Sequence, residues 1–215
     1  MEQFSQNLSD VLKQPLPGQH AQKKMMPRLG TSFDRFSIEA KAGAREGAVL
    51  LLLYKKDGHI YFPLTQRHEY NGAHSGQISF PGGKVEMEDK SAIHTALRET
   101  EEELGIPQTS IQVLGTLTDM FIIASNFNVR PVVGFTEDPP EFSLDPREVA
   151  EVIEISLEQL LDNTLVKEKE IRINNKFPIH APYFDFDGYH VWGATAMMLS
   201  EFKQIISEYI HPMLS

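Results

Sequence analysis

Four glutamates stand within five positions near the middle of the chain, at residues 99 and 101–103. If the segment from Lys90 to Leu104 is a helix that advances about 100° per residue, three of them share one face: Glu99, Glu102 and Glu103. Carboxylates at this helical spacing repel each other and destabilise the helix. A hard divalent cation such as Mg²⁺ would offset the repulsion, because it takes oxygen ligands. The spacing therefore indicates either a metal site or a solvated acidic face.

The flanking residues favour the metal site. Phe80-Pro81-Gly82-Gly83 precedes the acidic run, and Gly105 stands where a left-handed C-cap of the helix belongs. From Gly83 to Ile106 the string resembles the Nudix box, in which a glycine and an acid precede Arg-Glu-apolar-x-Glu-Glu-x-Gly-apolar. The second half matches at every constrained position, with Thr100 at the first semi-apolar site.

The first half of the box departs from its commonest form. Five residues separate Gly83 from Asp89, which stands where glutamate is usual, and eight residues instead of seven separate Asp89 from Arg98. This form looks like the coenzyme A pyrophosphatase branch of the Nudix hydrolases. The resemblance implies an α+β fold, an αβα sandwich around a mixed β-sheet, with Mg²⁺ or Mn²⁺ as the cofactor.

The resemblance also implies roles for the box residues. Glu99 and Glu103 are the firmest metal ligands, and Glu102 is a third ligand or orients the attacking water. The carbonyl of Gly83 is a common extra ligand in the family. Arg98 holds a box carboxylate in its productive rotamer, although a guanidinium also suits a phosphate. From spacing alone, Glu102 could instead form an i, i+4 ion pair with Arg98.

Other residues near the box have two interpretations each. Asp89 caps the helix, supports the arginine, or does both. Lys84 reaches a substrate phosphate or is only solvated. One of Glu148 and Glu151, which precede an expected strand, is a candidate general base; the alternative is that both are loop acids in water.

A second motif of the same branch lies at residues 64–83. The branch pattern has Leu-Thr-x-Arg-Ser, then an arginine, a glycine and Phe-Pro-Gly-Gly. The chain matches it in register at these positions: Leu64, Thr65, Arg67, Gly76 and residues 80–83. Arg67 is therefore a predicted substrate-binding residue, and His74 and Lys84 are further candidates for this role.

Two positions of this motif differ. His68 replaces the serine, and Gly72 stands where the second arginine belongs. Coenzyme A carries a 3′-phosphate besides its diphosphate, so a missing cation weakens the prediction of this substrate. The candidates to replace that cation are His68, His74, Lys55 and Lys56.

Composition limits the remaining function classes. The 215 residues fit one domain with extensions. A net charge of −10 without a Lys/Arg cluster argues against a nucleic-acid partner. The absence of cysteine excludes disulfides and cysteine nucleophiles and is compatible with a cytoplasmic location. No apolar run is long enough to span a membrane, and the N-terminus lacks the pattern of a signal peptide.

Hydrophobic periodicity predicts the elements that position these residues. The apolar run 48–54 and the alternating run 59–65 read as a hairpin around Asp57-Gly58. Further strands are expected at 77–80, 111–118, 129–135, 169–173, 176–179 and 183–186. Helices are expected at 157–162 and from Trp192 onward, and 122–128 and 166–170 are expected to be loops. Strands mixed with a few helices favour an α+β fold.

The N-terminal region has its own helix. Phe4, Leu8, Val11 and Leu12 recur at helical spacing before Leu16-Pro17-Gly18. We divide the chain into an N-terminal helical extension, residues 1–45, and a Nudix hydrolase domain, residues 46–215. The extension is expected either to pack on the domain as a cap or to form half of a homodimer contact.

The leading hypothesis is a metal-dependent hydrolase that cleaves coenzyme A or acyl-CoA to 3′,5′-ADP and (acyl-)4′-phosphopantetheine. An alternative keeps the chemistry and changes the substrate to ADP-ribose, a nucleotide sugar or a dinucleoside polyphosphate. A third hypothesis is a Nudix-like module that binds ligand without catalysis, against which the complete box argues.

Overall fold

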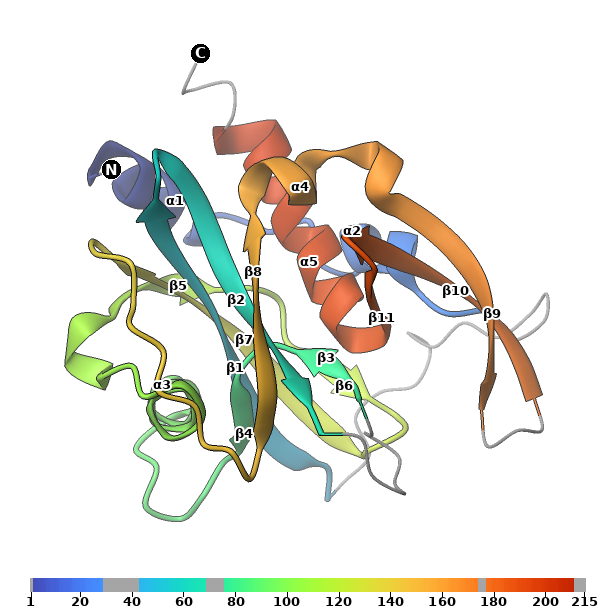
Figure 1. The fold of residues 1–215 in the computed structure, drawn as a ribbon, viewed down its shortest axis with the longest axis horizontal. Coiled ribbons are helices and arrows are strands. Elements are labelled where there is room, and N and C mark those ends of the chain that lie inside the picture. The colour runs from blue at the N-terminus through green and yellow to red at the C-terminus, as the bar shows by residue number, and fades with distance from the viewer. Residues whose placement is uncertain (1, 29–42, 69–75, 174–176, 211–215) are drawn as a thin grey trace.

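A computed structural model describes residues 2–28, 43–68, 76–173 and 177–210 (Figure 1). Its centre is a mixed β-sheet whose main path runs β3-β2-β1-β7-β5. The strands of this path are β1 Arg45–Lys56, β2 His59–Arg67, β3 Ile78–Ser79, β5 Gln112–Thr116 and β7 Phe127–Thr136. Three more strands join it: β4 Gly82–Lys84 pairs with β1, β6 Met120–Ile122 with β7, and β8 Val149–Ser156 with β2.

The sheet contains both strand orientations. β1 and β2 form the expected antiparallel hairpin, and both turn residues, Asp57 and Gly58, have positive φ, as a type I′ turn requires. β1 runs parallel to β7 over its whole first ten residues. The predicted mixed sheet and α+β class are therefore confirmed.

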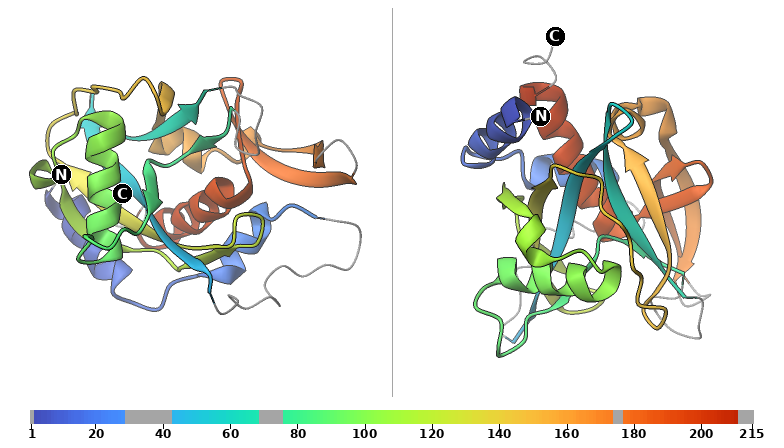
Figure 2. Two further views of the ribbon diagram at one scale, coloured as in Figure 1. Left: turned by 90° about the horizontal axis from the view of Figure 1, so that it is seen from below. Right: turned by 60° about the vertical axis from the view of Figure 1, so that its left-hand side comes forward.

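Helix α3, Ala92–Leu104, covers one face of the sheet (Figure 2). Its buried residues Ala96 and Leu104 pack with Leu50 and Leu52 of β1. The helix begins two residues later than expected, because the side chain of Ser91 accepts the backbone N–H of His94 and forms the N-cap. It ends at Gly105, in the predicted left-handed conformation, with φ 71°.

Helices on the other face complete the sandwich (Figure 2). The main one is α5, Gly193–Ile205, and α1, Glu2–Leu12, and α4, Leu157–Leu161, pack into the same core cluster. Shorter helical segments are α2 Gln19–Gln22, η1 Lys23–Met25, η3 Gln108–Ser110, η4 Asn163–Leu165 and η5 Ile206–Ile210. None of the helices in the described ranges combines the length and the apolarity that crossing a bilayer requires.

A second, three-stranded sheet corrects one expectation. Its order is β11-β10-β9, with β9 Val166–Ile173, β10 Phe177–Phe186 and β11 Tyr189–Trp192. The expected loop at 166–170 is wrong, because β9 pairs with β10 from Val166 onward. Its alternating lysines and glutamates are typical of an edge strand. In the main sheet, the expected loop at 122–128 is confirmed only at 123–126, because β6 ends at Ile122 and β7 already begins at Phe127.

The N-terminal segment is joined to the rest of the molecule through a buried carboxylate. Glu201 of α5 is fully buried and accepts hydrogen bonds from three places: the backbone N–H of Gly18 (3.2 Å), the side chain of Gln22 (2.8 Å) and the hydroxyl of Thr118 (2.7 Å). Phe4 and Leu8 of α1 are also buried in the main core cluster. The division at residue 45 remains a prediction.

Candidate active site

The two glycines before α3 allow very close packing around Glu99. A Cβ on Gly83 would lie 2.4 Å from the carboxyl carbon of Glu99, so any side chain at this position would displace that carboxylate. Gly82 has a φ of 151° and its missing Cβ would lie 2.3 Å from the carbonyl oxygen of Ala48 in β1. Only glycine fits there. The Gly-Gly pair therefore lets β4 pair with β1 and at the same time contact the carboxylate of Glu99 on α3.

Glu103 is a buried carboxylate without a full set of partners. It is 4% exposed, and its Oε2 has no hydrogen-bond partner among the described residues. Arg67 approaches it with 3.9 Å between Nη2 and Oε1. Burial raises the pKa of Glu103 to about 8; Arg67 acts in the opposite direction, and the charges of Glu99 and Glu148 raise the pKa further. Nothing in the described structure neutralises this group completely.

Arg98 connects the acids of the box. Its Nε and Nη2 donate to the two carboxylate oxygens of Asp89, at 3.0 and 2.9 Å, and its Nη1 lies 2.9 Å from Glu99 Oε1 and 3.0 Å from Glu102 Oε2. The structural interpretation of Arg98 therefore agrees with its contacts. The ion pair with Glu102 that the i, i+4 spacing allowed is also present.

Asp89 supports the arginine and does not cap the helix. It is 1% exposed in its side chain and also accepts hydrogen bonds from the hydroxyl of Thr95 (2.8 Å) and the backbone N–H of Glu86 (2.9 Å). The hydrogen bonds from Arg98 hold the pKa of Asp89 far below its usual range. Sequence reasoning missed Thr95, although its position three residues before Arg98 puts it on the same side of the helix.

The donor set suits a divalent cation. Carboxylates from Glu99, Glu102 and Glu103 and the carbonyl of Gly83 are the hard oxygen ligands that Mg²⁺ prefers. A cation would stabilise the unpartnered Oε2 of Glu103. It would also stabilise the charged form of Glu99, whose pKa is raised by burial. Among the described residues, however, no three acidic or histidine side chains already converge on one point. Because Arg98 holds Glu99 and Glu102, a cation has to compete with it for their oxygens.

The connection between β7 and β8 brings a further acid to the box. The backbone N–H groups of Ser143 and Asp145 donate to the carbonyls of Leu104 and Glu103, at 2.8 and 3.1 Å. These bonds fix the connection against the last turn of α3. The charge of Glu148, three residues further on, raises the pKa of both Glu99 and Glu103.

The other predicted residues are partly brought together. Lys84 is exposed at the end of β4, and its backbone carbonyl accepts a hydrogen bond from Arg98 (3.3 Å). His68 bonds the carbonyl of Pro146 (2.9 Å), in the same connection that carries Glu148. Lys56 pairs with Glu154 at 2.6 Å and lies on the distant β1–β2 hairpin, so it is a poor replacement for a substrate cation. His74 and Gly72 lie outside the described residues.

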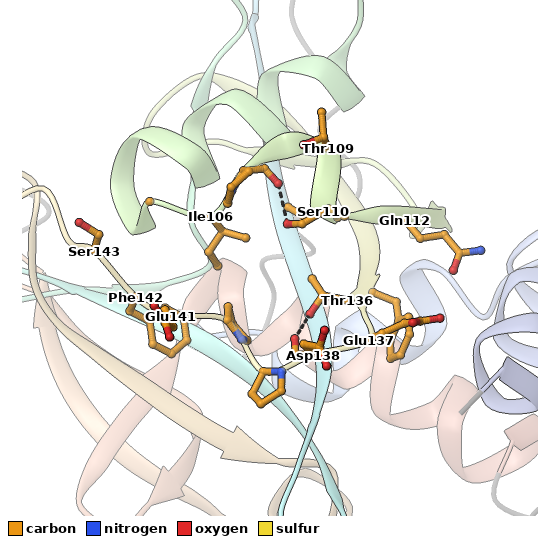
Figure 3. Close-up of a pocket in the computed structure, with 16 residues that line it drawn as sticks. Ile106, Thr109, Ser110, Gln112, Thr136, Glu137, Asp138, Glu141, Phe142 and Ser143 are labelled. Atoms are coloured by element: carbon orange, nitrogen blue, oxygen red, sulfur yellow. Dashed lines mark hydrogen bonds between the residues drawn. The ribbon is translucent and has the colours of Figure 1, made fainter.

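A cavity of about 850 Å³ lies beyond the C-terminal end of α3 (Figure 3). It is bordered by Gly105 and by the start of the β7–β8 connection, with Thr109 and Gln112 opposite Glu137 and Glu141. None of the box acids lines it. Since the chemistry predicted from the box needs those acids, we assign the candidate active site to the acidic face of α3 and not to this cavity.

Comparison with known proteins agrees with this assignment. Residues 44–175 match the family model described as the NUDIX domain. A relative from Photorhabdus laumondii, named "Uncharacterized Nudix hydrolase NudL", is 37% identical over 163 residues, which cover 74% of this chain and 84% of the relative. The protein of the same name from Yersinia enterocolitica is 36% identical and covers 67% and 73%.

Solved structures share the fold at low identity. RenU, a Nudix hydrolase from M. smegmatis, superposes with a TM-score of 0.53 and 15% identity, over 76% of this chain and 86% of that one. This likeness shows the fold alone. The family match over residues 44–175 and the two NudL relatives show that the chain belongs to the Nudix family and that its activity is that of a pyrophosphohydrolase.

Proposed function

We propose that the protein hydrolyses the diphosphate of coenzyme A or acyl-CoA, giving 3′,5′-ADP and (acyl-)4′-phosphopantetheine, with Mg²⁺ or Mn²⁺ as the cofactor. The observation that carries the proposal is the contact between Arg67 and Glu103 (3.9 Å). Through this contact, Arg67 of the upstream motif that resembles the coenzyme A branch lies next to Glu103, the buried acid of the Nudix box.

Each residue of the box has a distinct task in this proposal. When bound, the metal supplies charge neutralisation and polarises the phosphoryl oxygen. Glu99, Glu102 and Glu103 would hold it, together with the carbonyl of Gly83. Arg98 orients the carboxylates of Glu99 and Glu102 through its contacts with both. It can do so because its guanidinium is fixed by two hydrogen bonds that it donates to Asp89.

We assign substrate binding to Arg67, which is 40% exposed in its side chain while its guanidinium points toward Glu103. A guanidinium in this place can bind a phosphate oxygen beside the metal site. His74 and Lys84 keep their predicted substrate contacts as proposals.

Glu148 is the better candidate for the general base. Its charge acts on both Glu99 and Glu103. Glu151, the alternative, accepts a hydrogen bond from the hydroxyl of Tyr189 at 2.8 Å, which ties it to β11. Glu148 would take the proton of the attacking water as that oxygen bonds to phosphorus and the bridging oxygen leaves.

The alternative substrates are ADP-ribose, a nucleotide sugar or a dinucleoside polyphosphate. Gly72, in place of the second arginine of the branch motif, favours them, because coenzyme A has an additional phosphate to neutralise. The non-catalytic hypothesis has less support, since every acid of the second half of the box is present.

The test is turnover of purified protein with coenzyme A and Mg²⁺, followed by identification of the products. We expect 3′,5′-ADP to appear only when the metal is present. Rapid turnover of ADP-ribose without turnover of coenzyme A would favour the alternative substrates. No metal-dependent turnover of any diphosphate in the panel, with retained ligand binding, would support the non-catalytic hypothesis.

The same proposal includes the partners and location. We expect a small diphosphate-containing molecule, with neither nucleic acid nor membrane as a partner, and a cytoplasmic protein. A homodimer formed through the N-terminal extension is also a prediction, and light scattering of the purified protein would measure the mass that tests it.

A further inference from the structure

An arginine at the start of β1 is stacked on an aromatic ring that lies near the carbonyl of Gly83, and the proposed mechanism gives this arginine no role. The guanidinium of Arg45 stands 4.2 Å above the centre of the Phe127 ring. The two residues face each other as partners in the parallel pairing of β1 and β7. Their strands meet next to β4, in the lower part of Figure 1.

The stack is close to the oxygen that would bind the metal. A Cβ on Gly47 would lie 2.9 Å from the carbonyl oxygen of Gly83 and 3.1 Å from the Phe127 ring, so ring and oxygen are no more than about 6 Å apart. The side-chain position of Gly83 in turn touches the carboxylate of Glu99. The Phe127 ring therefore lies near the carbonyl of Gly83, on the face of β1 opposite to Ala48 and Leu50, which pack against α3.

The charge of Arg45 is available to a ligand. The side chain is exposed, and within the described ranges it forms no ion pair with a carboxylate; its Nη2 donates to the carbonyl of Ser125. The neighbouring acid Glu46 instead accepts from the side chain of Asn128 (3.2 Å). The aromatic face and the Ser125 carbonyl hold the guanidinium in one place and leave its other N–H groups free for an anion.

We propose that Arg45, held by Phe127, binds a phosphate group of the substrate. The inference rests on the proposed function, because the phosphate belongs to the molecule whose diphosphate lies at the metal site. It also offers a replacement for the second arginine of the branch motif, at whose position the sequence has Gly72: β1 supplies a cation whose ring partner lies near the carbonyl of Gly83. The phosphate is either the additional one of coenzyme A or part of the scissile diphosphate.

The experiment compares wild type with Arg45→Ala, using coenzyme A and dephospho-coenzyme A. Loss of a charged hydrogen-bond donor should raise KM for coenzyme A about 10–100-fold while kcat changes less than twofold. Arg45→Lys should recover part of the loss, and Phe127→Leu should give an intermediate KM. Arg130→Ala is the matched control, because the guanidinium of Arg130 is already paired with Asp119 (2.8 and 2.7 Å).

The two substrates identify the phosphate. If the KM effect disappears with dephospho-coenzyme A, Arg45 binds the 3′-phosphate; if it persists, Arg45 binds the diphosphate. An unchanged KM for both substrates, or a fall in kcat alone, would overturn the proposal.

Binding of 3′,5′-ADP, measured by calorimetry without substrate turnover, separates this inference from the proposed function. Weaker binding by Arg45→Ala would support the role of Arg45 even if wild type hydrolysed neither substrate. Equal binding by both proteins, or no binding by wild type in the absence of turnover, would overturn it.

Discussion

Replacing Glu103 by glutamine should stabilise the protein in the absence of metal. The pKa of Glu103 rises from an ordinary 4.5 to about 8 on folding, chiefly through burial. The folded protein therefore binds this proton more tightly than the unfolded chain does. The contribution of Glu103 to the free energy of unfolding should therefore fall as the pH rises from 4.5 to 8, at about 1.4 kcal/mol per pH unit, and stay level above pH 8.

The size of the effect follows from these two pKa values. Over the whole interval the carboxylate costs roughly 4–5 kcal/mol, since each pKa unit corresponds to about 1.4 kcal/mol. Glutamine removes the charge but leaves a buried amide with imperfect partners, which costs about 1–3 kcal/mol. The net expectation for Glu103→Gln is a gain of about 2 kcal/mol at pH 9 and a small loss at pH 4.5, where the wild-type group is protonated.

Urea unfolding in EDTA at both pH values measures the change, and Mg²⁺ then separates the two proteins. A cation that binds only the folded state stabilises it by mass action, so wild type should gain stability with Mg²⁺ and Glu103→Gln should gain little. Glu101→Gln is the control on the same helix, because Glu101 is exposed and accepts from Gln108 (2.7 Å). A Glu103→Gln variant that is less stable than wild type at pH 9 in EDTA would refute the reasoning.

Three further substitutions test other parts of the structure. Asp89→Asn should lower the free energy of unfolding by about 3 kcal/mol, because it leaves the guanidinium of Arg98 without its buried partner. It should also lower kcat. If urea unfolding and turnover of this variant both match those of the exposed control Glu88→Gln, the prediction is contradicted. Gly83→Ala should lower kcat/KM at least tenfold while circular dichroism stays native, since a Cβ there overlaps the carboxylate of Glu99; full activity would show that this carboxylate need not keep its position. Glu201→Gln should lower the free energy of unfolding by about 1–3 kcal/mol, because a fully buried carboxylate that accepts several hydrogen bonds is replaced by an amide with a misdirected donor. The substitution should also speed proteolysis within residues 2–28. An unchanged unfolding midpoint would argue against the role of Glu201 in joining the N-terminal segment to α5.

The sequence predicted those parts of the fold that depend on local signals. The β1–β2 hairpin followed from Asp57-Gly58 between two apolar runs, and α3 followed from its period and from Gly105 at its end. The second half of β9 was predicted at 169–173, but its first half was missed because the charged residues 167–170 have no apolar face, and pairing with β10 makes them part of the strand. The start of β7 at Phe127 was missed because its partner residue in β1, Arg45, is 82 positions away.

The candidate site was predicted in composition but not in geometry. Helical spacing put Glu99, Glu102 and Glu103 on one face, but it gave no sign that Glu103 is buried while the side chain of Glu102 is 58% exposed. That difference arises from β4 and Arg67, which cover only one side of the helix. The position of Arg45 was equally hidden, since the strand pairings that place Phe127 opposite Arg45 and Gly83 opposite Ala48 are long-range. The roles of these residues in catalysis remain predictions.

Titration of the purified protein with Mn²⁺, followed by electron paramagnetic resonance, tests most directly whether the acidic face of α3 is a metal site. We predict that wild type removes Mn²⁺ from the free-ion signal in saturable fashion and that the double variant Glu99→Gln/Glu103→Gln does not. Wild type without bound Mn²⁺, or a double variant that binds it equally well, would contradict the account.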